Sequence, residues 1–338
     1  MPNPVLTEAI DRVAGGEDLA AEEAARVLAE IMEGRADHSE TAGFLIALRT
    51  KGETVHEIAG LASTMRKLAL QVDAGDDLID TAGTGGGRPT FNVSTTAAFI
   101  AAGAGCRVAK HGNRSATSQC GSADVLEALG GRIDLEPDDV AACINEVGFG
   151  FMFAPKHHAA TRYVVPVRKA LGVRTIFNFL GPLTNPAGAR RQVIGVSDPG
   201  KLRTMAAALG ELGTERALVV SSADGLDEFS VSGPTQVVEL NDGRLTTYEV
   251  RPRDVGLERC ADAAVGAGTP DENARVLRSV LAGENGPERA LAALNAGAAI
   301  YAAGRSDSIA DGVRAAERSI DSGAAAGVFE RWLQRVAA

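Results

Sequence analysis

A glycine-rich block, Gly83–Gly87, ends a short apolar run and stands where a strand would pass into a helix. Glycines carry no side chain, so their backbone N–H groups can point together into one concavity. Ser94 or Thr95 can cap the alanine-rich helix that follows, and the start of a helix favours an anion. The chemistry that these residues indicate is the binding of a phosphate or polyphosphate.

The glycine block alone is equally typical of an ordinary tight turn. No Gly-Lys-Ser/Thr follows it, and Arg88 stands where a GxGxxG pattern requires glycine. The stretch KHGNRS, from Lys110 to Ser115, also follows an apolar run, and such a loop is hard to explain as surface decoration. Lys110 and Arg114 add positive charge on this loop, which favours the polyphosphate interpretation.

Two neighbouring carboxylates, Asp227 and Glu228, follow Gly225 and another apolar run. In isolation such a pair is more often a solvated acidic turn. Beside a phosphate site it indicates Mg²⁺, because hard cations prefer carboxylate oxygens. The adjacent His157 and His158 have no spaced partner and are given no metal-ligand role.

Length and composition limit the possible classes of protein. The 338 residues suggest about two domains, and 45% hydrophobic with only 4% aromatic residues predicts packing by small side chains. A net charge of −10 disfavours a nucleic-acid binder. The four cysteines show neither CxxC nor metal-ligand spacing, and no leader or membrane-spanning run is recognised, so we expect a cytoplasmic protein with no membrane partner.

The pattern of elements changes near residue 78. Residues 4–70 predict four helices, with Ser39 capping the third and Thr54 beginning the fourth. Beyond them, short apolar runs alternate with helical patterns, which predicts a largely parallel sheet with ligands beyond its carboxyl ends. We expect strands at 78–82, 106–109, 149–153, 193–196 and 217–221, helices at 95–104, 123–129, 137–147, 157–171 and 199–212, a hairpin over 236–250, and helices from 270, 287 and 309.

The blocks GTGG, NVST, KHGNRS and GSADVLEALG, in this order and spacing, resemble the anthranilate phosphoribosyltransferase family. PVRKALGVRTIFNFLGPLTNPA and the Asp227-Glu228 pair extend the resemblance over nearly the whole chain. It implies Mg²⁺-dependent transfer of 5-phosphoribose from phosphoribosyl diphosphate (PRPP) to the amine of anthranilate, in tryptophan biosynthesis. The products are N-(5-phosphoribosyl)anthranilate and diphosphate.

The resemblance also implies an α/β fold in two domains and a homodimer. A small all-helical domain would comprise residues 1–71 and 157–185 and would form the dimer surface. A larger α/β domain, with a mainly parallel central sheet, would comprise residues 72–156 and 186–338 and bind PRPP.

The site residues implied by the resemblance fall into three groups, and none is a covalent nucleophile. His111 is interpreted as a packed loop histidine rather than a general base, because the amine of anthranilate is already neutral near pH 7. The residues implied for PRPP are Gly83, Gly86, Gly87, Asn92, Ser94, Thr95, Lys110, Asn113, Arg114, Ser115, Thr117, Ser118 and Ser122. Those implied for anthranilate are Gly83, Asn113 and Arg168, and those for Mg²⁺ are Ser94, Asp227 and Glu228.

One departure from the family pattern concerns the glycine block. The family usually has Asp after Gly-Thr-Gly-Gly, whereas this chain has Gly87 and a turn that is one residue shorter. Our hypothesis is that the site recruits excess Mg²⁺ less readily than a Gly87→Asp variant would. Two alternatives are a nucleoside phosphorylase, which would not need the acidic pair, and a non-catalytic nucleic-acid-binding relative, which the acidic charge and intact Lys110 oppose.

Overall fold

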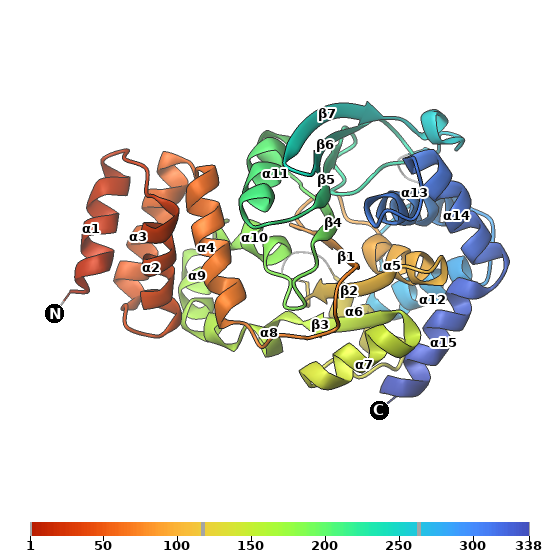
Figure 1. Ribbon diagram of the computed structural model, residues 1–338, viewed down its shortest axis with the longest axis horizontal. Helices are drawn as coiled ribbons and strands as arrows, with labels where there is room; N and C mark the ends of the chain where they lie inside the picture. The colour runs from red at the N-terminus through yellow and green to blue at the C-terminus, as the bar shows by residue number, and fades with distance from the viewer. Residues whose placement is uncertain (1, 116–118, 262–264, 338) are drawn as a thin grey trace.

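The computed structural model describes residues 2–115, 119–261 and 265–337, and shows a helical lobe beside a larger α/β lobe (Figure 1). The N-terminus lies at the outer end of the helical lobe, and the C-terminus lies on the α/β lobe. Within the described ranges, no helix has the length and apolar character needed to span a bilayer.

The four predicted N-terminal helices are confirmed, and their caps explain where they begin. Thr54 caps the fourth helix as expected, and its side chain accepts a hydrogen bond from the Glu57 N–H. The prediction for the third helix was wrong, because its cap is Asp37, whose carboxylate accepts the Glu40 N–H at 2.8 Å. The helices are α1 (Pro4–Ala14), α2 (Ala21–Met32), α3 (His38–Lys51) and α4 (Val55–Leu68).

The segment that returns to the helical lobe is broken into short pieces, and the prediction of one helix over 157–171 was wrong. Pro166 has no N–H to continue the hydrogen bonding of a preceding turn, so a new helix begins beside it. The pieces are α8 (Ala154–His157), the 3-10 turn η1 (Ala159–Tyr163), α9 (Val165–Leu171), α10 (Phe177–Leu180) and η2 (Gly181–Leu183).

A seven-stranded sheet forms the centre of the α/β lobe, in the order β3-β2-β1-β4-β5-β6-β7. Neighbours from β3 to β5 pair in parallel, as expected, and β6 and β7 form the predicted antiparallel hairpin. Its turn places Asp242 and Gly243 at φ 46° and 79°. The strands are β1 (Leu78–Gly83), β2 (Arg107–Gly112), β3 (Phe149–Phe153), β4 (Arg191–Gly195), β5 (Arg216–Ser222), β6 (Thr235–Asn241) and β7 (Arg244–Val250).

Helices cover both faces of the sheet, and small residues allow close packing. A Cβ on Gly312 would lie 2.1 Å from the Gly297 carbonyl oxygen, so α13 and α14 pack closely there. The predicted helical tail is divided at Gly323, which has φ 74°. The remaining helices are α5 (Val93–Gly103), α6 (Ser122–Ala128), α7 (Pro137–Val147), α11 (Leu202–Glu211), α12 (Pro270–Leu281), α13 (Pro287–Ala302), α14 (Ile309–Asp321) and α15 (Ala324–Val336), with 3-10 turns η3 (Pro199–Lys201) and η4 (Pro252–Val255).

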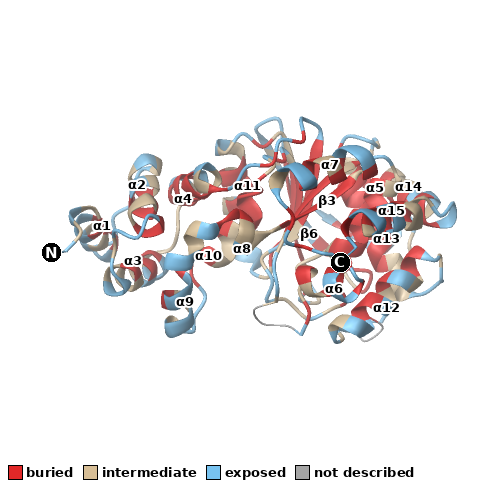
Figure 2. Cartoon of the chain, turned by 90° about the horizontal axis from the view of Figure 1, so that it is seen from below, coloured by how far each residue is buried: buried red, intermediate tan, exposed pale blue. Residues whose placement is uncertain are grey.

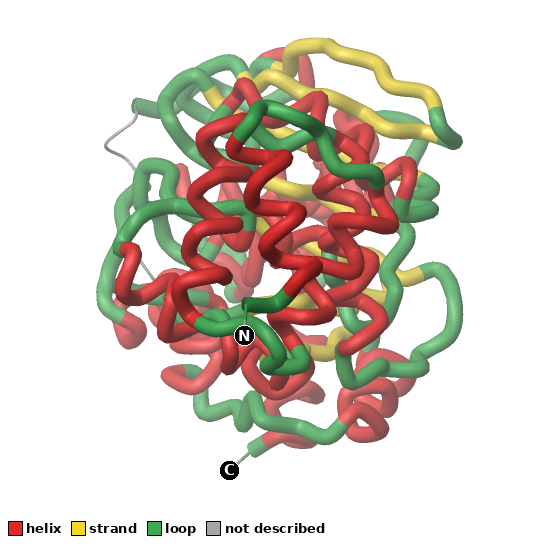
Figure 3. Tube along the Cα trace, turned by 90° about the vertical axis from the view of Figure 1, so that its left-hand side faces the viewer, coloured by secondary structure: helices red, strands yellow, loops and turns green. Residues whose placement is uncertain are grey.

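Two hydrophobic cores lie on opposite faces of the sheet. One joins α5, α13 and α15, and contains Phe99 stacked 4.2 Å from Phe149 and the buried Trp332. The other joins the helical lobe and α11 to the opposite face. Figure 2 shows buried residues concentrated at the centre of the α/β lobe, and Figure 3 shows the N-terminal helices lying in front of the strands.

The order of strands creates a switch point at β1. The chain adds β2 and β3 on one side of β1, and β4 and β5 on the other. Ligands of parallel sheets bind at the carboxyl ends of strands beside such a point. The glycine block and the KHGNRS stretch begin in the last residues of β1 and β2, and the acidic pair follows β5, so the fold brings all three to one edge.

Candidate active site

The glycine turn, Gly83–Gly87, folds against the loop that carries Asp227. Gly85 and Gly86 have φ of 67° and 80°, a region that favours glycine. The Gly85 N–H donates to Asp227 Oδ2 at 2.9 Å. Cβ atoms on Gly83 and Gly87 would lie 2.9 and 2.8 Å from the Asp227 carboxylate oxygens. The block therefore needs glycine for close approach to the acidic pair.

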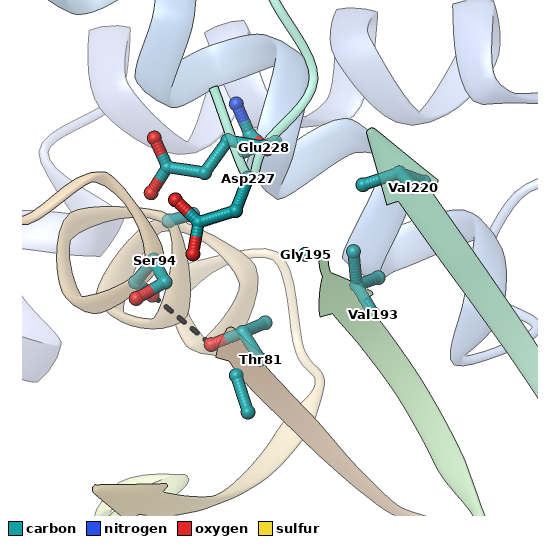
Figure 4. A pocket seen from close by; sticks show the side chains of 10 residues that line it. Thr81, Ser94, Val193, Gly195, Val220, Asp227 and Glu228 are labelled. Carbon is teal, nitrogen blue, oxygen red and sulfur yellow. Dashed lines mark hydrogen bonds between the residues drawn. The ribbon is translucent and has the colours of Figure 1, made fainter. Parts of the chain in front are cut away.

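Ser94, Asp227 and Glu228 converge on a small cavity beyond the end of β1 (Figure 4). Its volume of about 20 Å³ is enough for a single water molecule or ion. Ser94 comes from the first turn of α5, and the acidic pair comes from the loop after β5. Thr81 lines the same cavity, and its hydroxyl donates to the Ser94 carbonyl at 3.0 Å.

The electrostatics of this cavity favour a cation. Burial raises the pKa of Asp227. Burial and the neighbouring Asp227 charge raise the pKa of Glu228 well above its ordinary range, although hydrogen bonds from Thr90 and the Ser94 backbone oppose the rise. No described group of three or more His, Cys, Asp or Glu side chains could hold a metal. The oxygens that line the cavity, two carboxylates and a hydroxyl, are of the kind that Mg²⁺ prefers, but they are too few to complete its coordination without oxygens of water or substrate.

The side chains at the start of α5 do not cap the helix. The cap residue is Asn92, which makes no side-chain cap bond, so the prediction that Ser94 or Thr95 caps the helix was wrong. Asn92 Oδ1 instead accepts from Asn273 Nδ2 at 3.0 Å. Thr95 is buried, and its hydroxyl has no hydrogen-bond partner within the described ranges.

Lys110 lies inside β2, and the expectation that it stands on the following loop was wrong. The side chain is only 1% exposed, and its ammonium donates to the Thr81 carbonyl and to Ser94 Oγ, the latter at 3.2 Å. Burial lowers its pKa to about 8, against the charges of Asp80 and Glu228, which raise it. Lys110 therefore contacts two residues that line the cavity, Thr81 and Ser94, and does not lie on a loop over it.

The loop after β2 folds onto α6. Arg114 forms ion pairs with Asp124, at 2.9 Å, and with Glu127. The Ser115 N–H donates to Asp124 Oδ2 at 3.2 Å. Ser122 is the first residue of α6 rather than its cap, and its hydroxyl donates to the Asn113 carbonyl at 3.2 Å. The predicted Thr117 and Ser118 lie outside the described residues.

Arg168 stands apart from this cluster, on α9. It is half-buried, and its guanidinium lies 5.5 Å from the centre of the Phe177 ring. Burial lowers its pKa. Its side chain forms no hydrogen bond or ion pair with any described residue. A partly desolvated arginine with unused donors suits a planar carboxylate.

The three histidines near this edge are structural in their contacts. A ring nitrogen of His111 lies 3.2 Å from the Gly181 carbonyl oxygen, and rings of His111 and His158 lie 5.1 Å apart. Burial lowers the pKa of His111 well below its ordinary value and that of His158 to about 4. His157 contacts the Leu70 carbonyl at 2.9 Å. All three are therefore neutral near pH 7.

Two residues that were not predicted from the sequence also lie at this site, Asp80 and Arg174. Asp80, wholly buried in β1, accepts from the His111 N–H at 3.1 Å and from Asn185 Nδ2 at 2.7 Å. A carboxylate within an otherwise apolar strand was the available signal. Arg174 contacts the glycine turn, and no local pattern pointed to this contact.

The chain matches the helical bundle domain of the glycosyl transferase family over residues 7–69, and its a/b domain over residues 75–326. An anthranilate phosphoribosyltransferase of Rubrobacter xylanophilus is 54% identical over 98% of this chain and 97% of that protein. The one from Moorella thermoacetica is 49% identical over 99% of this chain and 100% of its own.

Solved structures agree in fold. The enzyme of that name from Thermus thermophilus has a TM-score of 0.93 and 45% identity, and covers 98% of this chain and 99% of its own. The one from Saccharomyces cerevisiae, in complex with PRPP and Mg, has a TM-score of 0.88 and 29% identity, and covers 98% and 97%.

Proposed function

The chain belongs to the anthranilate phosphoribosyltransferase family, and we propose that its reaction takes place at the carboxyl ends of β1, β2, β4 and β5. The 5-phosphoribosyl group passes from PRPP to the amine of anthranilate, with Mg²⁺, and diphosphate leaves. The observation that carries this placement is the convergence of Ser94, Asp227 and Glu228 beside the glycine turn.

Mg²⁺ bound by Ser94, Asp227 and Glu228 would neutralise charge on the diphosphate. The glycine turn surrounds the same leaving group with backbone N–H donors. Lys110 directs its charge at Ser94 from the buried side. The remaining residues that we assign to PRPP are Gly83, Gly86, Gly87, Asn92, Thr95, Asn113, Arg114 and Ser115, with Ser122 and the undescribed Thr117 and Ser118.

The Asp227–Gly85 contact indicates how metal and PRPP depend on each other. In the protein alone, Asp227 Oδ2 accepts the Gly85 N–H at 2.9 Å. If the Asp227 carboxylate held Mg²⁺ instead, this N–H would be free to donate to a phosphate oxygen. We therefore expect Mg²⁺ and PRPP to bind more tightly together than separately.

Anthranilate is assigned to Arg168, with Asn113 and Gly83 lining the approach to the ribose carbon. Arg168 would bind the carboxylate and so align the amine. The amine attacks in its neutral form, so no base is needed before the new N–C bond forms, and the proton that the nitrogen then loses can pass to water or to the departing diphosphate. Catalysis is then alignment together with charge stabilisation at the leaving group, and no side-chain nucleophile is required.

We propose that the helical domain comprises residues 1–71 and 157–185, and the α/β domain residues 72–156 and 186–338. The chain segments that cross between these two domains lie side by side. The Leu70 N–H donates to the His157 carbonyl at 2.8 Å, and the Val72 N–H donates to the Pro186 carbonyl at 3.1 Å. The two family models also part between residues 69 and 75.

We also propose a homodimer formed through the helical domain. Ile46 on α3, Val165 on α9 and Val173 just beyond it are 36%, 51% and 45% exposed, and because α3 and α9 contact each other these apolar side chains offer surface that a second copy could bury. A cytoplasmic location fits the four cysteines, all within the described ranges, which form no disulfide. Size-exclusion chromatography with light scattering tests the dimer.

The fluorescence of anthranilate offers a direct test of activity. With PRPP and Mg²⁺ the signal should fall, and without either it should stay constant. Glu228→Gln should slow the reaction strongly, whereas Glu258→Gln, at another loop carboxylate, should not. Constant fluorescence in the complete mixture, with nucleoside phosphorolysis or nucleic-acid binding instead, would overturn the proposal.

A further inference from the structure

Arg174 connects the segment that returns to the helical lobe with the glycine turn and with the loop that follows β4. Its guanidinium donates to the Gly86 carbonyl at 3.0 Å and to Ser197 Oγ at 3.1 Å. Ser197 in turn donates its N–H to Thr84 Oγ1 at 3.2 Å. A Cβ on Gly86 would lie 2.0 Å from Arg174 Nη2, so glycine at this position leaves the space that the guanidinium fills.

The backbone of Arg174 is anchored on the other side, in the helical lobe. Its carbonyl accepts from Arg49 Nη1 at 2.9 Å, and the next buried apolar residues, Ile176 and Phe177, belong to the core shared with α1–α4. The residue therefore reaches from the helical lobe to the edge of the sheet. Arg168 lies six residues earlier on the same segment.

The charge of Arg174 remains available. The residue is exposed, and in the described part of the chain it forms no ion pair, although Asp227 is near enough for its charge to lower the pKa of that carboxyl. A guanidinium has five N–H donors in a planar fork, of which these contacts use two. The unused donors and the charge lie beside a turn built to receive a polyphosphate.

We propose that Arg174 is a further binding residue for PRPP. Its guanidinium would bind the diphosphate beside the glycine turn, on the side that faces the helical lobe. This inference rests on the proposed function. When the substrate arrives, the fork exchanges the neutral Gly86 carbonyl for a charged phosphate oxygen, which is a stronger acceptor. Because the same segment carries Arg168, one short stretch would then contact both substrates.

Steady-state kinetics with each substrate varied in turn test the inference. Arg174→Gln should raise the KM for PRPP by about tenfold or more and leave that for anthranilate within about twofold, since charged hydrogen bonds are roughly twice as strong as neutral ones. Arg174→Lys should recover part of the loss, because it keeps the charge but not the fork.

Arg190→Gln is the matched control. Arg190 is an exposed arginine just before β4, at the opposite end of the sheet, and also donates to a backbone carbonyl, that of Gly213, at 3.2 Å. Its loss should leave both KM values unchanged. Calorimetric titration with PRPP and Mg²⁺ should rank the affinities of the variants in the same order.

An unchanged KM for PRPP in Arg174→Gln, or equal rises in KM for both substrates, would overturn the inference about Arg174. Turnover by the wild type in the same assay would still uphold the proposed function. A wild type without turnover refutes the proposed function instead. If the glutamine variant does not fold, the lysine variant decides by the same comparison of the two KM values.

Discussion

Replacing Gly87 by aspartate restores the family residue but should damage this site. A Cβ at position 87 would lie 2.8 Å from Asp227 Oδ1, 2.8 Å from the Gly225 carbonyl and 2.9 Å from the Asp227 N–H nitrogen. Two of these neighbours are backbone atoms, so a rotamer change cannot remove the clash. The glycine turn or the loop that carries the acidic pair must therefore move.

Small-to-large substitutions at packed positions typically cost about 1–3 kcal/mol. If this whole free-energy cost is a loss of transition-state stabilisation, kcat/KM should fall by about 5-fold to about 150-fold. Gly87→Ala carries the same Cβ and isolates the steric part. Gly87→Asp adds a carboxylate beside Asp227 and, if it recruits excess Mg²⁺, should lose further activity at high Mg²⁺.

The assay is initial rate of anthranilate consumption over a range of Mg²⁺ concentrations. Gly233→Ala serves as the control, because a Cβ there would meet no atom within 4 Å. The reasoning fails if Gly87→Ala keeps the kcat/KM of the wild type. The hypothesis that Gly87 limits recruitment of excess Mg²⁺ fails if wild type and Gly87→Asp show parallel magnesium profiles.

Three further predictions concern charged groups. Arg168→Gln should raise the anthranilate KM about tenfold or more, since a hydrogen bond to a charged group is worth about 1.5–3 kcal/mol, and an equal rise for PRPP would contradict its role. Glu228→Gln should melt at a higher temperature than wild type in EDTA, because burial raises the pKa of the Glu228 carboxyl and makes its ionised form costly to bury. Added Mg²⁺ should raise the melting temperature of the variant less than that of wild type. Equal rises, measured by calorimetry, would argue against Glu228 as a metal ligand. Burial raises the pKa of Asp80 from 3.8 to about 6, so the folded state binds the extra proton and the unfolding free energy should fall by about 2 kcal/mol as pH rises from about 4 to about 6. Urea titrations should show this fall in wild type and not in Asp80→Asn.

The sequence predicted the elements well because glycine and proline mark their ends. Pro137 begins α7 as expected, and the Asn241-Asp242-Gly243 turn joins β6 to β7. The alternation of strands and helices also placed the polar blocks at one edge of the sheet. These features depend on local residue types, so local patterns suffice to find them.

The errors in the site have a common cause in contacts between distant residues. Ser94 and Thr95 were predicted as caps, but α5 begins at Val93, and the side chain of Asn92 at the cap position contacts Asn273, 181 residues away. Arg174 reaches Gly86 across 88 residues. Lys110 is buried because β2 continues to Gly112, beyond the predicted end of the strand at residue 109. Local patterns do not encode such partners.

These partners also determine what each residue can add to substrate binding. Arg114 is paired with Asp124 and Glu127, so a phosphate must replace existing carboxylate contacts and gains only the difference. Arg168 gives up no ion pair or hydrogen bond with the described residues when it binds a carboxylate. Although Arg114 lies in the more family-specific motif, removing Arg168 should therefore cost more binding energy. The number of contacts that a residue already makes in the free protein, rather than its distance from the ligand alone, sets this order.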